Sequence, residues 1–270
     1  MFTVLGSNGF IGSHLKKYLE TIGEEGFYPP RDYVPDKNKN LGNVFYCIGL
    51  TADFRTRLFD TVNAHVIRLS EFLERATFDS FLYMSTTRVY AYSDSTGEEE
   101  PVKVNSSNSD DLYAISKLLG EAVCLSIAGK NVKVVRLSNV IGNDFRSENF
   151  LMQLITGAIE KKNIELRAHP MSEKDYVDIK TVVPLLLKIL SKGKHRLYNI
   201  ANGKNMNHLQ IVEKIQEQTG CTVKMDFSAP LQSFPVISIQ RLKEEFEIQP
   251  TDLMGAIPQL IQSYKKVKGE

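Results

Sequence analysis

The chain has 270 residues, of which 42% are hydrophobic and 24% are charged. This length and composition suit a globular protein with one large domain, or with a core domain that carries a smaller attachment. The formal net charge of +1 gives no broad basic field of the kind that attracts nucleic acid or anionic lipid. We therefore expect a small-molecule partner and no nucleic-acid partner.

The three cysteines, Cys47, Cys124 and Cys221, lie far apart among apolar or β-branched neighbours. Their spacing does not fit a zinc site, so no metal is expected, and buried reduced thiols are the favoured interpretation over redox sensing. No apolar run approaches the ~20 residues needed to cross a bilayer, and the N-terminus lacks the pattern of a signal peptide. These features predict a cytoplasmic protein with no membrane segment.

The first half of the chain alternates strands with helices. Residues 2–5 predict a buried strand, residues 10–22 a helix, and residues 26–28 a possible short strand before a polar, proline-containing loop. The pattern continues with strands at 44–48, 78–84 and 132–137 and with helices at 60–75 and 112–128. This alternation predicts an α/β protein with a doubly wound parallel sheet and helices on both faces.

The second half has a different character. Helices are expected at 150–162, 181–190, 208–218, 241–246 and 253–265, with a short strand at 197–200. We assign residues 1–140 to the α/β domain and residues 141–270 to a smaller C-terminal lobe, with 174–192 packing back on the first domain. The loop at 93–111, rich in Ser, Asn, Asp and Glu, is read as solvated surface rather than as a mobile rim of the site.

A glycine turn joins the first strand to the first helix, with the sequence Gly6, Ser7, Asn8, Gly9, Phe10, Ile11, Gly12. Gly6 permits a tight turn, Gly9 lets backbone amides approach a diphosphate, and Gly12 allows the helix to pack closely on the sheet. The positive end of the helix then favours the phosphates. The spacing departs from G-x-G-x-x-G, and an ordinary strand-to-helix turn is the alternative, but the strand and helix on either side favour a dinucleotide site.

The choice of dinucleotide depends on the segment about 20 residues past the glycines. Arg31 is able to pair with a 2′-phosphate there, and Asp32 is able to hold a ribose. The sequence thus supports both NADP and NAD, with a slight preference for NADP, while two solvated loop charges are the alternative.

Tyr113 and Lys117 lie four residues apart on a predicted helix and therefore share one face. A lysine ammonium beside a phenol favours the phenolate and makes the tyrosine a usable acid or base. By itself this pair is common in helices. Its significance rises because a predicted strand ends at Ser85, Thr86 and Thr87, where a hydroxyl can hold a substrate oxygen against Tyr113; a polar cap on the loop is the alternative.

Together these motifs resemble the extended short-chain dehydrogenase/reductases, in the NAD-dependent epimerase/dehydratase group that acts on nucleotide sugars. The resemblance rests on the glycine turn, on 85–90, on Tyr113-x-x-x-Lys117 and on 136–142, with weaker matches at 174–177 and 198–203. It implies a Rossmann fold, a nucleotide-sugar substrate and a homodimer built on the helices at 60–75 and 112–128.

The resemblance also implies residue roles. Tyr113 becomes the acid/base, Lys117 lowers its pKa and binds the nicotinamide ribose, and Thr86 orients the substrate oxygen. The implied cofactor contacts are Gly6, Ser7, Asn8, Gly9, Phe10, Ile11, Gly12, Arg31, Gly49, Leu50, Thr51, Tyr113 and Lys117. Thr87 is expected at the substrate, and Asn139, taken to end the last core strand, is expected at the nucleotide-sugar phosphates.

Some residues depart from the family pattern. Members that are 4,6-dehydratases carry Asp-Glu directly after the threonine, where this chain has Thr87 and Arg88. Dehydration is therefore not expected, and epimerisation and 4-keto-reduction both stay open. A dinucleotide-binding regulator or scaffold without catalysis is the hypothesis from another class of protein, and the presence of Thr86, Tyr113 and Lys117 weighs against it.

Overall fold

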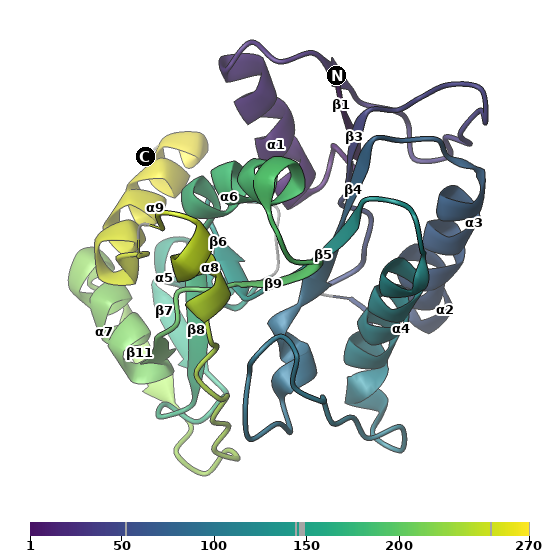
Figure 1. The fold of residues 1–270 in the computed structure, drawn as a ribbon. Helices are drawn as coiled ribbons and strands as arrows, with labels where there is room; N and C mark the ends of the chain where they lie inside the picture. Colours follow the sequence, from purple (N-terminus) through teal and green to yellow (C-terminus); the bar gives the residue numbers. More distant parts are fainter. Residues whose placement is uncertain (52, 144, 146–148, 249, 270) are drawn as a thin grey trace.

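A six-stranded parallel sheet forms the centre of the computed structural model, which describes residues 1–51, 53–143, 145, 149–248 and 250–269 (Figure 1). The strands, in sheet order, are β2 (Gly26–Phe27), β1 (Phe2–Leu5), β3 (Asn43–Tyr46), β4 (Ser80–Thr86), β5 (Val132–Leu137) and β9 (Leu197–Ile200). From β1 the chain runs first to β2 on one side and then to β3 on the other. In such sheets ligands bind where the order reverses, at the carboxyl ends of the strands.

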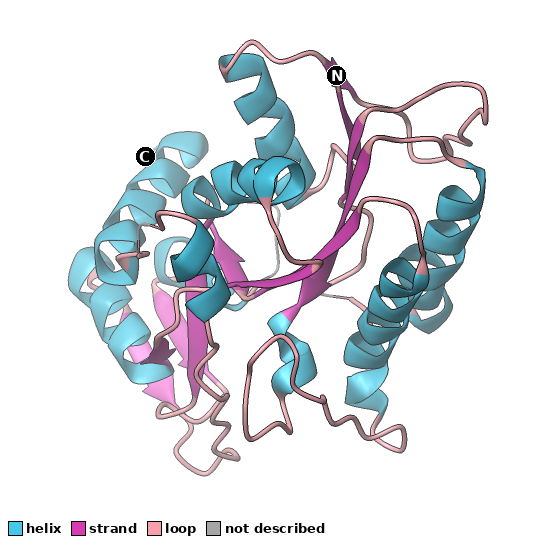
Figure 2. Ribbon diagram, in the orientation of Figure 1, coloured by secondary structure: helices cyan, strands magenta, loops and turns pink. Residues whose placement is uncertain are grey.

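Helices cover both faces of this sheet, as Figure 2 shows. The helices α1 (Phe10–Thr21) and α6 (Ile179–Lys192) pack on one face. The other face is covered by α3 (Arg68–Arg75) and α4 (Leu112–Ser126), with α2 (Leu58–Val62) beside α4. Successive side chains of β3 and β4 point to opposite faces, so both cores draw on the same strands. The expected doubly wound Rossmann fold is confirmed.

The C-terminal lobe has a core of its own. Its helices are α5 (Phe150–Glu160), α7 (His208–Thr219) and α9 (Leu253–Lys268). Two small sheets complete it: β10 (Asn205–Asn207), β8 (Glu173–Asp178) and β6 (Asn139–Ile141) form one, and β11 (Thr222–Met225) and β7 (Asn163–Leu166) form the other. The sequence did not predict these five strands because each is only three to six residues long. β7 and β11 do alternate polar with apolar residues, but over only four positions each.

The strand at 197–200 lies elsewhere than expected. It was expected in the lobe, but β9 pairs in parallel with β5 and completes the main sheet. The segment 174–192 is divided, since β8 pairs within the lobe whereas α6 packs on the main sheet. A four-residue buried strand carries no sequence signal for its partner, because burial on both faces removes the alternation that would mark one face.

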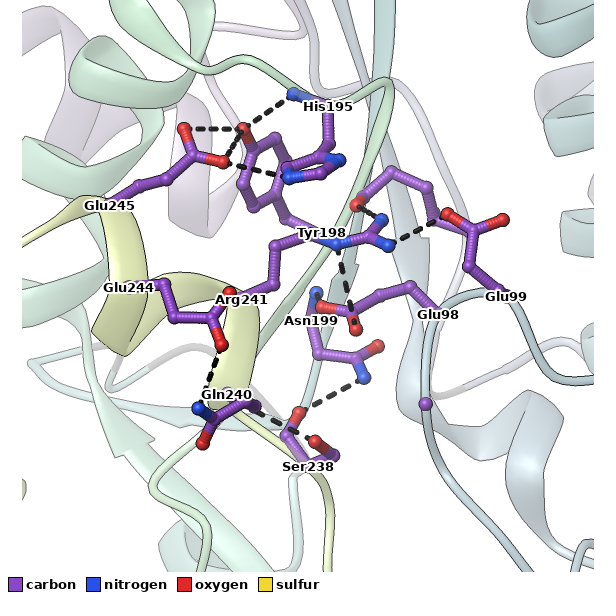
Figure 3. Close-up of polar contacts among 12 residues, drawn as sticks. Glu98, Glu99, His195, Tyr198, Asn199, Ser238, Gln240, Arg241, Glu244 and Glu245 are labelled. Atoms are coloured by element: carbon purple, nitrogen blue, oxygen red, sulfur yellow. Dashed lines mark hydrogen bonds and ion pairs between the residues drawn. The ribbon is translucent and has the colours of Figure 1, made fainter.

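The short helix α8 (Gln240–Glu245) returns to the main sheet and fastens its last strand (Figure 3). Arg241 donates from Nη1 to the carbonyl of Leu197 over 2.7 Å. Asn199, which is fully buried, donates from its side chain to the carbonyls of Thr96 and Ser238, and its backbone amide donates to Glu98. Through these bonds β9 also holds the loop that follows the end of β4.

No helix in the described part of the chain is long and apolar enough to cross a membrane.

Candidate active site

The glycine turn connects β1 to α1 through one residue with a left-handed backbone. Gly6 has φ +78°, and a Cβ there would lie 3.0 Å from the backbone of Cys47. A Cβ on Gly12 would overlap the Gly6 carbonyl oxygen, so this glycine lets α1 approach the turn. The fold itself therefore requires glycine at both positions.

Gly9 is different. Its φ of −78° and ψ of 171° suit any residue, and a Cβ would have only an ordinary contact of 3.4 Å with the Gly6 carbonyl. Gly9 caps α1 without a side-chain hydrogen bond, and the first turn holds no acidic residue. The helix thus presents backbone amides at its positive end beside a glycine that packing does not demand, which suits a phosphate group.

The loop after β3 lies next to α4. A Cβ on Gly49 would lie 3.2 Å from the Lys117 Nζ and 3.3 Å from the His65 Nε2. The backbone amide of Leu50 donates to His65 Nε2 over 3.1 Å, and the Thr51 hydroxyl forms a side-chain hydrogen bond with Tyr113. The segment that contains Gly49, Leu50 and Thr51 is therefore close to both Tyr113 and Lys117.

Thr86 and Tyr113 meet at the carboxyl edge of the sheet. β4 runs two residues further than expected, to Thr86, whose Oγ1 accepts from the Arg88 amide over 3.2 Å and caps a 3-10 turn at Thr87–Tyr90. The Thr86 side chain also hydrogen-bonds to Tyr113. Thr87 is buried in the turn. Thr86 thus does both things that the sequence offered as alternatives: its side chain caps the turn after β4, and it contacts Tyr113.

Burial raises the pKa of Tyr113, while hydrogen bonds from Thr51 and Thr86 and the charge of Arg88 lower it in part. Lys117 was expected to supply the lowering, but its Nζ donates to the Met84 carbonyl over 2.8 Å and is not among the groups that shift the Tyr113 pKa. In the chain alone, two hydroxyls and a guanidinium favour the phenolate. Lys117 itself is buried, and desolvation lowers its pKa to about 8.

His65 is a member of this site that the sequence analysis missed. It is fully buried, and desolvation lowers its pKa to about 2. Since Nε2 accepts from Leu50, Nδ1 carries the proton and donates to Ser116 Oγ over 2.8 Å; Ser116 in turn donates to the Tyr113 carbonyl over 3.0 Å. The neutral imidazole thus joins the loop after β3 to the turn of α4 that carries Tyr113. Only its place between apolar residues of a helix marked it in the sequence.

Comparison with known protein families identifies the family of this chain. A sequence profile described as "NAD dependent epimerase/dehydratase family" matches residues 40–201, more than half of the chain. The chain belongs to this family. The resemblance inferred from the motifs is therefore confirmed, and the family's curated relatives of this chain are nucleotide-sugar epimerases and reductases of the extended short-chain dehydrogenase/reductase superfamily.

Individual relatives of the family are distant in sequence. A dTDP-4-dehydro-6-deoxy-D-allose reductase from Streptomyces sp is 20% identical, over 97% of this chain and 95% of the relative. The solved structure of MoeE5 in complex with UDP-glucose and NAD superposes with a TM-score of 0.81 at 20% identity, over 99% of both chains. That of RMD from Pseudomonas aeruginosa complexed with NADPH has a TM-score of 0.81 at 19% identity, over 98% of this chain and 99% of the other.

Two further candidate residues lie apart from the Tyr113 group. Asn139 does not end the last core strand: it begins β6, donates from Nδ2 to the Asp175 carbonyl over 2.8 Å, and is exposed. The reason is that β5 ends at Leu137 and the chain then turns into the lobe, where Asn139 pairs with Tyr176 of β8, while β9 is the last strand of the main sheet. Arg31 is exposed in the loop after β2, where its carbonyl accepts from the Arg68 guanidinium. Both arginines line a small pocket with Leu5 and Ile48, at the ends of β1 and β3.

Proposed function

We propose that the protein is an NAD(P)-dependent nucleotide-sugar epimerase or 4-ketoreductase in which Tyr113 is the acid/base. The observation that carries this proposal is the meeting of the Tyr113, Thr86 and Thr51 hydroxyls at the carboxyl edge of the sheet. Thr51 belongs to the loop after β3, and the start of that loop borders Gly6 of the glycine turn. Membership of the epimerase/dehydratase family supports it. A binding protein without catalysis has no need of this hydroxyl cluster.

The chain's residues fit a dinucleotide. Gly9 and the free amides at the start of α1 suit the diphosphate, with Ser7, Asn8, Phe10 and Ile11 around it. Gly49, Leu50 and Thr51 border the nicotinamide end, and Lys117 is close enough to Gly49 to bind the nicotinamide ribose. When bound, the nicotinamide supplies hydride transfer to or from the sugar carbon.

Proton transfer falls to the side chains. Thr86 donates or accepts a hydrogen bond at the substrate oxygen and holds that oxygen against the Tyr113 hydroxyl. Tyr113 gives up its proton when the sugar carbonyl is reduced and takes one when the alcohol is oxidised. The neighbouring Thr51 hydroxyl and the Arg88 charge favour the phenolate that forms in the reductive direction.

Replacing Tyr113 with Phe tests the proposal, because it removes the proton donor with little change in volume. We expect Tyr113→Phe to bind the dinucleotide with near-parental affinity and to lose turnover of nucleotide sugar by about 100-fold or more. A variant that turns over nucleotide sugar at the parental rate would show that Tyr113 is not the acid/base. Cofactor that stays bound through purification favours the epimerase, whereas cofactor-free protein that consumes NADPH favours the reductase.

For the dinucleotide we propose a slight preference for NADP over NAD. Arg31 and Arg68 both line the small pocket at the ends of β1 and β3, together with Glu71, and the Arg68 guanidinium donates to the Arg31 backbone carbonyl there. This is the side on which Rossmann folds hold the adenosine ribose. Two guanidinium groups there suit a 2′-phosphate. Equal affinities for NADPH and NADH in a fluorescence titration would overturn this preference.

We also propose a homodimer built on α4 and on the helical segment 58–75, which consists of α2, a π-helical turn (Asn63–Ile67) and α3. Apolar side chains recur at helical spacing on their outer faces, at Phe59, Val62 and Val66 and at Leu112, Ile115 and Leu119. Phe59 is 89% exposed and Leu119 is 50% exposed. A second copy of the chain, paired helix to helix, would cover both stripes. The cytoplasmic location stays a prediction.

A further inference from the structure

The guanidinium groups of two arginines lie over the ring of Phe54, which is itself next to Tyr113. Its ring is buried and lies 5.4 Å from the Tyr113 ring, centroid to centroid. The Cζ of Arg55 lies 4.6 Å and the Cζ of Arg88 lies 5.3 Å from the centroid of the Phe54 ring. Both cations therefore lie close to the group that moves the proton, each stabilised in part by the aromatic face.

The two arginines differ in their partners. The Arg55 Nε donates to Asp110 Oδ1 over 2.6 Å, so its charge is balanced at the surface. Arg88 is partly buried, and within the described ranges of the chain its guanidinium has neither a hydrogen-bond acceptor nor a carboxylate partner. Burial and the charge of Arg55 lower the pKa of Arg88. A partly desolvated cation without an anion is unfavourable until an anion arrives.

A third cation approaches from the C-terminal lobe. Lys174 of β8 lies with its Nζ 5.7 Å from the Phe150 ring centroid, again without a carboxylate partner among the described residues. Burial lowers the pKa of Lys174, and the charges of Arg88 and Arg55 lower it further. The two lobes thus direct positive charge at one region. Among the described residues, Asp110 is paired with Arg55, and the charges of Asp110 and Asp111 offset that of Arg88 only in part, without forming an ion pair with it.

We propose that the sugar of the substrate bears a carboxylate next to its reacting carbon, and that Arg88 binds this carboxylate. The inference rests on the proposed function, because that function places the sugar against Tyr113. Arg88 follows Thr86 by two residues within the 3-10 turn and shares the Phe54 ring with Tyr113. The substrate class is therefore a nucleotide-linked uronate.

The position of Arg88 separates a sugar carboxylate from the diphosphate. In a nucleotide hexose the diphosphate is attached to C1, across the ring from C4, whereas a C6 carboxylate is attached to C5, the neighbour of C4. A cation that adjoins the acid/base at C4 therefore adjoins C6. An arginine at position 88, in place of the glutamate of the family's 4,6-dehydratases, also reverses the charge that a carboxylate would meet, and its planar fork matches a carboxylate.

The test compares ligands that differ only at C6. The full chain is titrated with UDP, UDP-glucose and UDP-glucuronate, and with the corresponding dTDP compounds, in the presence of the dinucleotide. We expect the uronate to bind at least ~10-fold more tightly than the neutral sugar in one nucleotide series, and Arg88→Met to weaken uronate binding on the order of 30-fold. Binding of UDP or the neutral sugar by Arg88→Met should change less than about threefold.

Arg55→Met is the matched control, since Arg55 packs on the same Phe54 ring but its charge is already balanced by Asp110. This variant should weaken uronate binding less than about threefold. Arg88→Lys keeps the charge without the fork, so an intermediate loss is expected, and dinucleotide affinity and melting temperature report that each variant is folded.

If Arg88→Met lost affinity equally for UDP, for the neutral nucleotide sugar and for the uronate, Arg88 would be assigned to the diphosphate and the inference would be overturned. A parent protein that turns over neutral sugars and does not prefer the uronate in either series would overturn it as well, while leaving the proposed function intact. If no nucleotide sugar of either kind binds although the dinucleotide does, the proposed function itself fails.

Discussion

We expect the buried ammonium of Lys117, which we propose binds the nicotinamide ribose, to make cofactor binding depend on pH. Its pKa is lowered from 10.5 to about 8 by desolvation, so the free protein loses this charge as the pH rises through about 8. Between about 8 and 10.5 the unfolded chain holds the proton more tightly than the folded one, and the contribution of Lys117 to stability therefore increases with pH. Cofactor binding and folding stability are thus expected to change in opposite directions as the pH rises.

We expect the affinity of the parent protein for NAD(P)H to fall above about pH 8, by roughly tenfold per pH unit if the ammonium is essential for binding. Fluorescence titrations from pH 6.5 to 9.5, at about ten concentrations each, would measure it. Lys117→Met should bind more weakly and show no such decline. The same decline in both proteins would assign the pH dependence to another group.

Some residues of the site follow from the sequence and others do not. Thr86 and Tyr113 were predicted to be neighbours because a strand end and the following helix share one edge of a parallel sheet. Thr51, by contrast, was expected only at the cofactor, and its bond to Tyr113 depends on the path of the loop after β3. His65 and Phe54 also depend on that path. No pattern of residues encodes how such a loop folds back.

Between α2 and α3 the helix widens into one π-helical turn at Asn63–Ile67. Such a turn disturbs the regular pairing of carbonyls, and here two tyrosine hydroxyls supply donors: Tyr46 to the Ala64 carbonyl over 2.9 Å and Tyr83 to the His65 carbonyl over 3.3 Å. The turn brings His65 toward Leu50 and Ser116. The sequence predicted one continuous helix at 60–75 because the apolar spacing barely changes across a single wide turn.

Gly120 of α4 fits against this π-helical turn. A Cβ there would overlap the Tyr83 hydroxyl and lie 2.9 Å from the His65 carbonyl oxygen. A glycine-to-alanine change within a helix usually stabilises it, but here we expect Gly120→Ala to lower the free energy of unfolding by about 1–3 kcal/mol. Urea denaturation followed by circular dichroism would measure the change. A higher urea midpoint for the variant than for the parent would show that α4 and the π-helical turn move apart without a loss of stability.

The same helix is tied to the sheet by a buried ion pair. Arg136 of β5 donates from Nη2 to Glu121 of α4 over 2.7 Å, and Ser85 of β4 donates to the same carboxylate. Arg136 Nη1 also donates to the Tyr90 hydroxyl over 2.7 Å. Such a network contributes more to a fixed arrangement than to net stability. It holds the end of β4, and with it Thr86, in register with Tyr113.

At the scale of the whole molecule, substitutions in the apolar stripes on the segment 58–75 and on α4 test the proposed dimer. We expect the parent to sediment as a dimer at micromolar concentration and Phe59→Glu with Leu119→Glu to sediment as a monomer, because each introduced carboxylate would be buried in the interface. Val267→Glu, at a 65% exposed residue of α9, is the control and should leave the mass unchanged. A monomeric parent would remove the dimer from the proposal.

The class of the fold was predictable because the alternation of strands and helices in the first half of the chain is strong. The assembly of the second half was not. Its small strands β6, β7, β8, β10 and β11 pair with segments far away in the chain, and the pairing of β9 with β5 depends on α6 returning the chain to the main sheet. Such long-range pairings leave no local pattern to read.

Because β9 returns to the main sheet, the chain cannot be cut into two independent halves, and its C-terminal half cannot be exchanged as one piece with that of a relative. The chain leaves the sheet after β5, comes back for α6 and β9, leaves again for β10, and comes back with α8 before ending in α9. A gene cut near residue 140 would yield one fragment with an open edge along Val134–Leu137 and another with an orphaned strand. Exchanging substrate specificity with a relative by swapping C-terminal halves would therefore require grafting several separate segments onto a retained β9.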